Sequence, residues 1–257
     1  MTTHQLCDIL NQFAPLSLQD SWDNSGLQID NNNAAVTGVL ICFDITEASL
    51  HEAIAKNCNV IIAHHPLIFN GIKQIGQQSY VERCIRLAIL HNIAIYANHT
   101  PLDKIQGGCS WVLANKLGLE NVTYLPTNQE MMYGVMGTLP TAVEEMDFVA
   151  LLKEKLHATC IRCSAVLGKP IRQVALCGGS GAFLIEQAIQ AGADAYVCGD
   201  IKHHDFYLAD QKILLADIGH FESEIATKEI FFSILSKKIP TFALHLSEND
   251  KSPIYCF

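Results

Sequence analysis

The chain alternates between short apolar runs and amphipathic stretches with helical spacing. Residues 36–43 and 60–63 are apolar runs that predict buried strands. Residues 46–57, between them, predict a helix that begins at a threonine cap. Short links in a strand–helix–strand unit favour parallel pairing with a right-handed crossover. The alternation continues along the chain and therefore predicts an α/β fold.

The same two periodicities predict the remaining elements. Helices are expected at residues 4–13, 79–91, 108–117, 143–156, 182–191, 204–209 and 222–235, and strands at 93–97, 133–138, 159–166, 174–177, 195–198, 213–216 and 241–244. Residues 119–133 are predicted to be irregular. We place the boundary between two halves in this segment, so that the first half is 1–125 and the second is 126–257.

The two halves resemble each other. The alignment has two blocks, in which residues 39–63 match 174–198 at an offset of 135, and residues 93–99 match 214–220. In the first block His64 and His65 lie opposite Gly199 and Asp200. The alternative is coincidence between similar strand–helix units of one sheet. Duplication explains the matches better and predicts two related βα half-domains with an asymmetric site.

Histidines and acids collect where predicted strands end. His64 and His65 follow the strand at 60–63, and Pro66 stops that strand from continuing. Two later strands end in a histidine followed four residues later by an acid; the pairs are His99 with Asp103 and His220 with Glu224. Because parallel strands end at one edge of a sheet, these side chains are expected to gather there.

The expected ligands are His64, His65, Asp103, His220 and Glu224. Imidazole and carboxylate donors suit divalent zinc, iron, manganese, cobalt or nickel, and without thiolates they more often form open sites than structural ones. The adjacent histidines are expected to point to opposite sides and so to reach two neighbouring ions. Two such ions can hold a bridging water that is acidic enough to serve as hydroxide. The sequence therefore predicts a dinuclear centre.

Other histidines on the same edge have more than one interpretation. His99 is either a further ligand or a group that orients Asp103. His203 and His204 follow another strand, and we expect them to support the ligands or to transfer protons rather than to ligate.

Two further segments lie near predicted strand ends. Gly178, Gly179 and Ser180 form either a substrate-binding turn that cradles a phosphate or a simple tight turn. Residues 21–28 are expected to form a polar loop that is anchored by Trp22 and from which Asp23 could reach a site.

Composition narrows the classes of protein. A formal charge of −9 opposes generic nucleic-acid binding. No apolar run reaches the roughly 18 residues of a membrane span, and the first residues lack a signal-peptide pattern. We therefore expect a cytoplasmic protein whose ten cysteines are mostly reduced core residues. The CxxC spacing at residues 160–163 fits a strand better than a metal or redox site.

Five motifs together resemble one known family. They are Trp22-Asp23-Asn24-Ser25-Gly26-Leu27-Gln28, His64-His65-Pro66, Asn98-His99-Thr100-Pro101-Leu102-Asp103, Gly199-Asp200-Ile201-Lys202-His203-His204 and Gly219-His220-Phe221-Glu222-Ser223-Glu224. In this order they are similar to the GTP cyclohydrolase 1 type 2 homologue family, also called NIF-three-like proteins. The resemblance covers essentially the whole chain.

The resemblance implies a two-part α/β protein with a dinuclear metal site between related halves and a ring-shaped homohexamer. It implies the same five ligands that the residues suggested. Some relatives carry an inserted domain in mid-chain, which residues 119–133 are too short to hold, so the chain resembles the compact form. The family name implies hydrolytic opening of the guanine ring of GTP.

Two functions from different classes fit these expectations. The first is a metal-dependent hydrolase whose bridging hydroxide attacks a nucleotide or a related heterocycle. The second is a metal-binding or regulatory scaffold that forms a ring and has no turnover.

Overall fold

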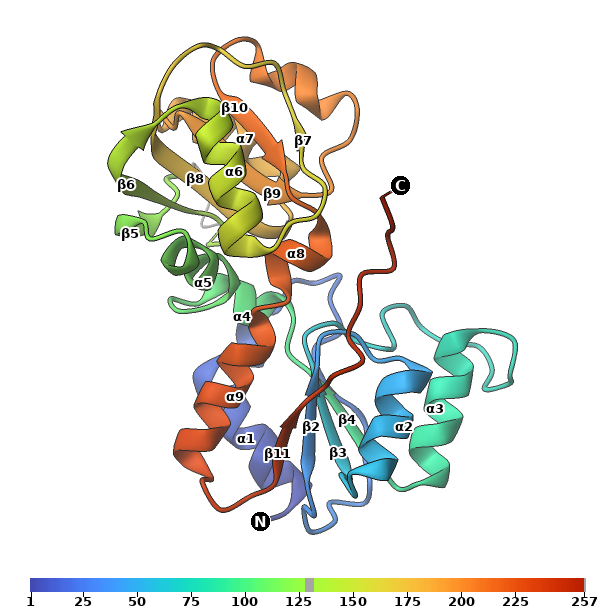
Figure 1. Ribbon diagram of the computed structural model, residues 1–257. Coiled ribbons are helices and arrows are strands. Elements are labelled where there is room, and N and C mark those ends of the chain that lie inside the picture. The colour runs from blue at the N-terminus through green and yellow to red at the C-terminus, as the bar shows by residue number, and fades with distance from the viewer. Residues whose placement is uncertain (128–131, 257) are drawn as a thin grey trace. The chain divides into compact units, whose positions relative to one another are not determined.

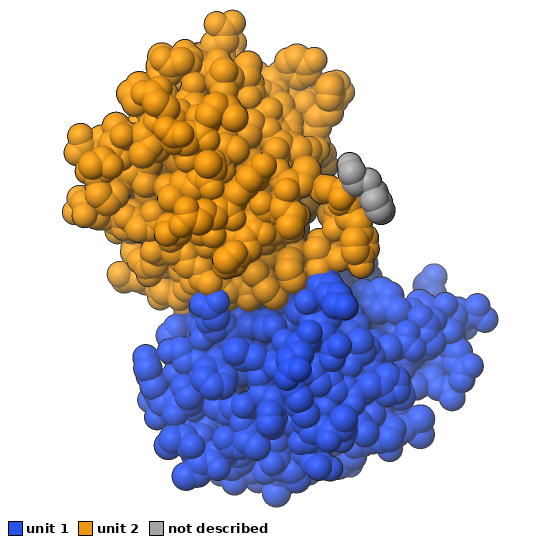
Figure 2. Space-filling view, viewed as in Figure 1, with its two compact units in different colours: residues 1–102, 227–251 blue, residues 103–226, 252–257 orange. Residues whose placement is uncertain are grey.

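The computed structural model describes residues 1–127 and 132–256, and within them the chain forms two compact units (Figure 2). Unit 1 comprises Met1–Leu102 and Thr227–Lys251, and unit 2 comprises Asp103–Ala226 and Ser252–Phe257. These units divide the chain at other positions than the predicted halves, because the chain returns to unit 1 near its end. Residues 128–131, in the segment predicted to be irregular, lie outside the described residues.

Unit 1 is built on a sheet with the strand order β1-β4-β3-β2-β11 (Figure 1). Its strands are β1 (Gly26–Ile29), β2 (Val39–Cys42), β3 (Val60–Ala63), β4 (Ala94–Ala97) and β11 (Leu244–Leu246). Its helices are α1 (Thr3–Phe13), α2 (Glu47–Ala55), α3 (Tyr80–Leu90) and α9 (Thr227–Lys238), with a 3-10 turn η1 (Leu16–Leu18). Four of these strands are parallel, and β1 pairs antiparallel with β4 at the edge.

Helices cover both faces of this sheet, with α2 and α3 on one side and α1 and α9 on the other (Figure 1). Leu40, Ile61 and Ile95 face the first pair of helices, where they pack in one apolar cluster with Leu50 and Ile85. All residues of β2, β3 and β4 are buried. Strands covered on both faces have continuous apolar sequences, which is why the runs at 36–43 and 60–63 predicted them correctly.

Unit 2 contains a mixed sheet with the order β5-β6-β8-β9-β10-β7. Its strands are β5 (Glu120–Tyr124), β6 (Val135–Val143), β7 (Arg162–Cys163), β8 (Ile171–Ser180), β9 (Ala195–Gly199) and β10 (Leu214–Asp217). Its helices are α5 (Cys109–Lys116), α6 (Glu145–Leu156), α7 (Ile185–Gln190) and α8 (His220–Glu224), with 3-10 turns η2 (Ala182–Leu184) and η3 (Asp205–Ala209). The short helix α4 (Thr100–Lys104) spans the boundary between the units in the sequence.

The strand registers agree with the first block of the predicted duplication. β2 and β3 pair in parallel with Val39 opposite Val60, and β8 and β9 pair in parallel with Val174 opposite Ala195. Both pairs are related by the offset of 135. The α/β prediction with two related half-domains is therefore confirmed for the strand–helix–strand core of each unit.

The second block of the alignment is wrong by one residue. Ala94 pairs with Val60, and Leu214 pairs with Ala195, so Ala94 rather than Ile93 corresponds to Leu214. As a result His99 lies two residues beyond the end of β4, whereas His220 lies three beyond the end of β10. The link after β10 is thus one residue longer than the link after β4. It contains Gly219, whose φ of +92° makes a backbone turn that the link after β4 does not have.

Several predicted elements differ in type or extent. Residues 26–29 form the edge strand β1 instead of a loop, and residues 120–124 form β5 within the segment predicted to be irregular. The helix predicted at 222–235 is two helices, α8 and α9. Among the described residues no helix is long and apolar enough to cross a membrane, in agreement with the sequence.

A buried carboxylate fastens the returning C-terminal segment to unit 1. Glu52 on α2 accepts hydrogen bonds from Lys56 Nζ (2.7 Å), Ser247 Oγ (2.8 Å) and Asn249 Nδ2 (2.8 Å). Burial alone would raise the pKa of Glu52, but these donors outweigh it and lower the pKa from 4.5 to about 2. Glu52 thus stabilises the folded protein in its charged form and links α2 to the segment that follows β11.

We predict that Glu52→Gln lowers the free energy of unfolding by about 1–3 kcal/mol at pH 7, because a buried hydrogen-bonded charge is lost. The folded pKa lies below the unfolded one, so the contribution of Glu52 is complete above about pH 4.5 and is lost as the pH falls toward 2. Urea unfolding at pH 7 and at pH 3 measures both effects. The control is Glu248→Gln, which removes the exposed partner of Lys56 and should change stability little; equal losses in the two variants would contradict this assignment.

Candidate metal centre

Three histidines gather at the carboxyl edge of the sheet of unit 1. His64 and His65 directly follow β3, and His99 follows β4, the next parallel strand. One ring nitrogen from each of the three lies within 4.8 Å of the others, which is close enough for one metal ion. His64 is fully buried and stacks on Phe43, with ring centroids 5.9 Å apart. The prediction that strand ends bring histidines together is therefore met in unit 1, and His99 joins the group.

The expectation that His64 and His65 point to opposite sides is wrong. Their ring centroids are only 4.8 Å apart, and both rings contribute to the same group of nitrogens. Strand β3 ends at Ala63, so the alternation of a strand no longer applies to the two residues after it. The two imidazoles can therefore contribute to the same ion, and the number of ions that they serve stays a prediction.

Carboxylates orient two of these rings. His65 Nδ1 donates to Asp44 Oδ1 at 2.8 Å, and His99 Nδ1 donates to Asp23 Oδ1 at 2.9 Å. An ionised carboxylate only accepts hydrogen bonds, so each Nδ1 carries a proton and Nε2 is the ring atom that can bind a metal. Histidines that bind a metal typically donate a hydrogen bond of this kind from their other ring nitrogen.

Asp23 is held in place by a network of its own. Its carboxylate also accepts from Ser25 Oγ (2.8 Å) and from Thr100 Oγ1 (2.6 Å). Burial would raise the pKa of Asp23, but the hydrogen bonds from His99, Thr100 and Ser25 hold it well below its usual range. Asp23 is therefore a charged, rigid partner for His99, as the sequence suggested when it placed this residue within reach of a site.

Unit 2 brings together a second group of ligand types. Glu224 and His220 lie one turn apart on α8, with His220 Nε2 2.9 Å from Glu224 Oε2. Carboxylate oxygens of Asp103 and Glu224 lie within 4.8 Å of each other, and both side chains are buried. His220 Nδ1 donates to Asp200 Oδ2 at 2.7 Å, which repeats the arrangement of His65 and His99. The sequence placed Asp103 in the first half, whereas in the structure it belongs to unit 2 together with His220 and Glu224.

The electrostatics of this group favour a cation. Burial alone would lower the pKa of His220, but its hydrogen bonds to Asp200 and Glu224 and their negative charges raise the pKa to about 11. In the metal-free protein His220 is therefore protonated. A divalent ion would compete with that proton for the same carboxylate-rich environment.

Nearby thiols do not add to the ligand set. Burial, and then the charges of Glu224 and Asp103, raise the pKa of Cys109 far above its ordinary value. Burial does the same for Cys177. A thiol that stays protonated does not bind metal as thiolate, so the donors of unit 2 are nitrogen and oxygen.

The glycines at the end of β8 have a role that the sequence did not predict. Gly178 N donates to Ser110 Oγ at 3.1 Å and Gly179 N donates to Ser223 Oγ at 2.9 Å. Gly179 has φ +66°, and a Cβ at this position would collide with the Glu224 carboxylate. These residues therefore make room for Glu224. The predicted binding of substrate by Gly178, Gly179 and Ser180 stays a prediction, and it would need groups other than those two N–H groups.

The remaining candidates form a pair of their own. The rings of His203 and His204 lie 5.1 Å apart, and both approach Tyr207 on the surface of unit 2. They belong to neither ligand group described above, and their role in proton transfer stays a prediction. The sequence argument missed Asp44 and Asp200. Each follows the end of a buried parallel strand closely, and this position was the available signal.

The family of the chain follows from residues 1–253, which match the family model described as Duf34/NIF3 (NGG1p interacting factor 3). The chain belongs to the Duf34/NIF3 family. A GTP cyclohydrolase 1 type 2 homolog of Clostridium acetobutylicum is 32% identical over 247 residues, covering 93% of this chain and 90% of the relative. One of a Nostoc species is 37% identical over 190 residues, covering 72% of each chain. The resemblance inferred from the five motifs is confirmed.

Other members of the Duf34/NIF3 family are longer. The match to a GTP cyclohydrolase 1 type 2 homolog of Staphylococcus epidermidis runs over 363 residues, with 27% identity, although this chain has 257 residues. The relative thus contains residues that this compact chain lacks. A solved Staphylococcus aureus hypothetical protein has a TM-score of 0.92 and 30% identity, covering 100% of this chain and 99% of that one. A Bacillus cereus protein related to NIF3 has a TM-score of 0.91 at 24% identity and supports the fold.

We predict that Asp44→Asn and Asp200→Asn each weaken zinc binding by about 10- to 100-fold, because each removes the carboxylate that orients a histidine. Competition with a chromogenic chelator measures the affinity. Asp210→Asn is the control, since Asp210 pairs with Lys212 on the surface of unit 2. Unchanged zinc affinity in both test variants would contradict the orienting role.

Gly179→Ala should both destabilise the protein and weaken zinc binding, because the added Cβ displaces Glu224 and the left-handed backbone is strained. Gly192→Ala is a matched control: Gly192 has φ +77°, but its Cβ would meet no atom within 4 Å. Thermal melting and chelator competition compare the two. Only Gly179→Ala is expected to lose zinc affinity, and an equal effect in both variants would contradict the contact with Glu224.

Proposed function

We propose that this Duf34/NIF3 protein is a metal-dependent hydrolase that uses two divalent ions and acts on a nucleotide or a related heterocycle. The observation that carries the proposal is the set of histidines whose Nδ1 atoms donate to carboxylates: His65, His99 and His220. A purely structural role for these hydrogen bonds does not explain why the same arrangement follows strand ends in both units. It is the usual arrangement for presenting Nε2 to a metal.

The donors fit divalent metals in number and type. Unit 1 offers imidazoles from His64, His65 and His99, and unit 2 offers carboxylates from Asp103 and Glu224 with the imidazole of His220. Such nitrogen and oxygen sets suit zinc, iron, manganese, cobalt and nickel, and they are typical of open, reactive sites. We propose that these donors bind the two divalent ions, whose identity elemental analysis would establish.

The chemistry follows from this donor set. Two bound divalent ions would supply the acidified water that hydrolysis at a carbon or phosphorus atom requires. The chain's own residues hold the ligand atoms in place: Asp44 and Asp23 fix the rings of His65 and His99, and Asp200 fixes His220. His203 and His204 are our candidates for proton transfer because they follow the same strand as Asp200.

The substrate class is inferred from the relatives. The curated proteins that the chain matches are named GTP cyclohydrolase 1 type 2 homologs, and they span both sequence halves. A nucleotide is consistent with an anionic ligand bound beside two cations. Assembly as a homohexamer and a cytoplasmic location remain expectations from the family resemblance and from the sequence.

We predict that the metal-loaded protein hydrolyses a nucleotide and that the double variant His65→Ala, Glu224→Ala does not, because a ligand is lost from each group. Metal content is measured first by elemental analysis. Nucleotides are then screened for release of formate and of phosphate. His51→Ala, which removes an exposed histidine on α2, is the control and should keep both metal and turnover.

The outcomes separate the candidate functions. Turnover that survives in the double variant would show that the reaction does not depend on these ligands. Stoichiometric metal without turnover of any nucleotide would favour the metal-binding scaffold instead.

A further inference from the structure

An exposed aromatic pair stands beside the histidines of unit 1. The ring centroids of Trp22 and Phe69 are 5.9 Å apart, and they lie 5.8 Å and 6.2 Å from the ring of His99. Trp22 is 56% exposed and Phe69 is 44% exposed. Trp22 was expected to anchor its loop, but more than half of its surface is exposed. Large apolar rings that stay in water next to candidate metal ligands need an explanation other than packing.

Hydrogen bonds fix both loops that carry these rings. Trp22 precedes Asp23, whose carboxylate is bound by His99, Ser25 and Thr100. Phe69 follows Ile68, whose backbone oxygen accepts from Asn24 Nδ2 and whose N–H donates to Gln28 Oε1 at 2.9 Å. The loop of Trp22 is thus bonded to the loop of Phe69. The two loops that carry the exposed rings are thus held by hydrogen bonds, and one of these networks is centred on the buried carboxylate of Asp23, as a preorganised binding site requires.

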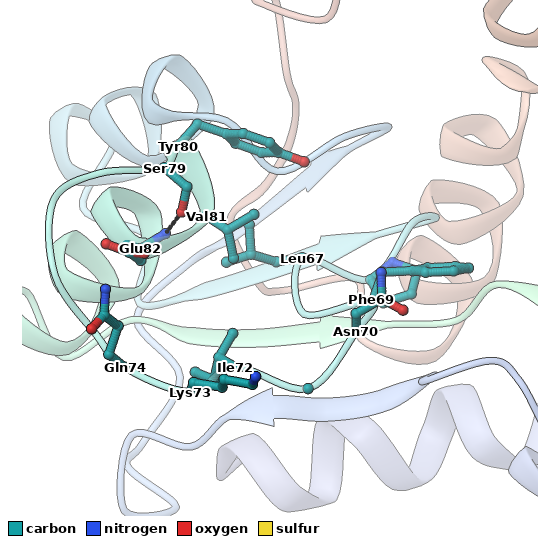
Figure 3. Close-up of a pocket in the computed structure, with 12 residues that line it drawn as sticks. Leu67, Phe69, Asn70, Ile72, Lys73, Gln74, Ser79, Tyr80, Val81 and Glu82 are labelled. Carbon is teal, nitrogen blue, oxygen red and sulfur yellow. Dashed lines mark hydrogen bonds between the residues drawn. The ribbon is translucent and has the colours of Figure 1, made fainter.

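Phe69 also borders the pocket of unit 1 that Figure 3 shows. This pocket has a volume of about 660 Å³, which is within the range of small-molecule sites. Its wall begins at Pro66, next to His65, and includes polar side chains such as Asn70 and Gln74. In Figure 3 the rings of Phe69 and Tyr80 lie on different sides of Leu67. A ligand held at Phe69 therefore lies next to this pocket.

We infer that Trp22 and Phe69 form a stacking site that holds the planar ring of the substrate next to His99. Aromatic side chains bind planar heterocycles through their faces, with little dependence on the pattern of hydrogen bonds. The inference rests on the proposed function for the choice of a heterocycle, and it adds the residues that bind it. Trp22 and Phe69 are positioning residues that hold the planar ring of the substrate. The proposed hydrolysis depends on the metal ions that the histidines and carboxylates described above would bind.

Binding is tested without turnover, on the full-length metal-loaded protein. Isothermal titration calorimetry with guanosine, adenosine, uridine and ribose 5-phosphate compares ligands with and without a base. We expect the nucleosides to bind, purines more tightly than uridine, and ribose 5-phosphate alone to bind at least tenfold more weakly than guanosine. In a Trp111→Phe background Trp22 is the remaining tryptophan, so its fluorescence should be quenched when guanosine binds.

Substitutions at the pair provide the decisive comparison. Trp22→Ala and Phe69→Ala should each weaken guanosine binding by about 10- to 100-fold, whereas Trp22→Phe should keep it within a few-fold. Tyr255→Ala removes a similarly exposed aromatic residue near the C-terminus and should change nothing. Melting temperature and zinc affinity should stay the same in all variants, because neither ring is buried.

Each result bears on one proposal at a time. Unchanged guanosine affinity in both alanine variants would overturn the stacking site, even if the wild-type protein hydrolyses nucleotides. A change of oligomeric mass in these variants without a change of affinity would overturn it too, because the pair would then be a contact between copies of the chain. Nucleoside binding that depends on Trp22 and Phe69, without any turnover, would support the stacking site and contradict the hydrolase.

Discussion

Parallel pairing of adjacent strands is the constraint on which the candidate centre depends. In unit 1 Val39, Val60 and Ala94 lie in register across three strands, so β2, β3 and β4 end level with one another. The residues that follow are Asp44, His64, His65 and His99. In unit 2 the same pairing of β9 with β10 brings Asp200 next to His220. Side chains that are distant in sequence meet because parallel strands that end level with one another place the residues that follow them at the same edge of the sheet.

The charged hydrogen bonds at these ends add rigidity to that placement. A histidine ring at a strand end can rotate, and a bond from Nδ1 to a carboxylate removes this freedom and selects the tautomer. The cost is burial of charge, which is clearest at Asp23. That carboxylate is buried, yet its pKa stays low because several donors surround it. Charges of this kind persist in a fold only where their partners are complete.

The sequence was sufficient for the elements whose apolar pattern is strong. The strands at 60–63 and 195–198 and the helices near 4–13 and 143–156 have the predicted type and nearly the predicted bounds. The motif residues at strand ends also lie in groups of side chains that could hold a metal ion. These predictions depend on local periodicity and on the topology that parallel strands impose, both of which a sequence encodes directly.

Other features depend on contacts that have no local signal. Strand β1 has two partly exposed residues in its middle and exists because β4 offers an open edge. The large apolar ring of Trp22 suggested an anchor, and only the structure shows that this ring is exposed and lies beside Phe69 and His99. His64 and His65 approach each other because β3 ends at Ala63. The sequence predicted this boundary correctly. It could not predict the direction of the two side chains that follow the strand.

The duplication shows how one topology came to hold two different sets of ligands. At the sequence offset of 135, His65 corresponds to Asp200 and Asp44 corresponds to Gly179. In unit 1 the first position holds His65, a candidate ligand, and the second holds Asp44, which orients the ring of His65. In unit 2 the first position orients His220, and the second gives space to Glu224. Among the candidate ligands, unit 1 therefore offers imidazole nitrogens, and unit 2 offers carboxylate oxygens together with the imidazole of His220. Both copies kept the parallel pairing of the strands, and the residues that follow the strand ends gave each copy its own set of donors.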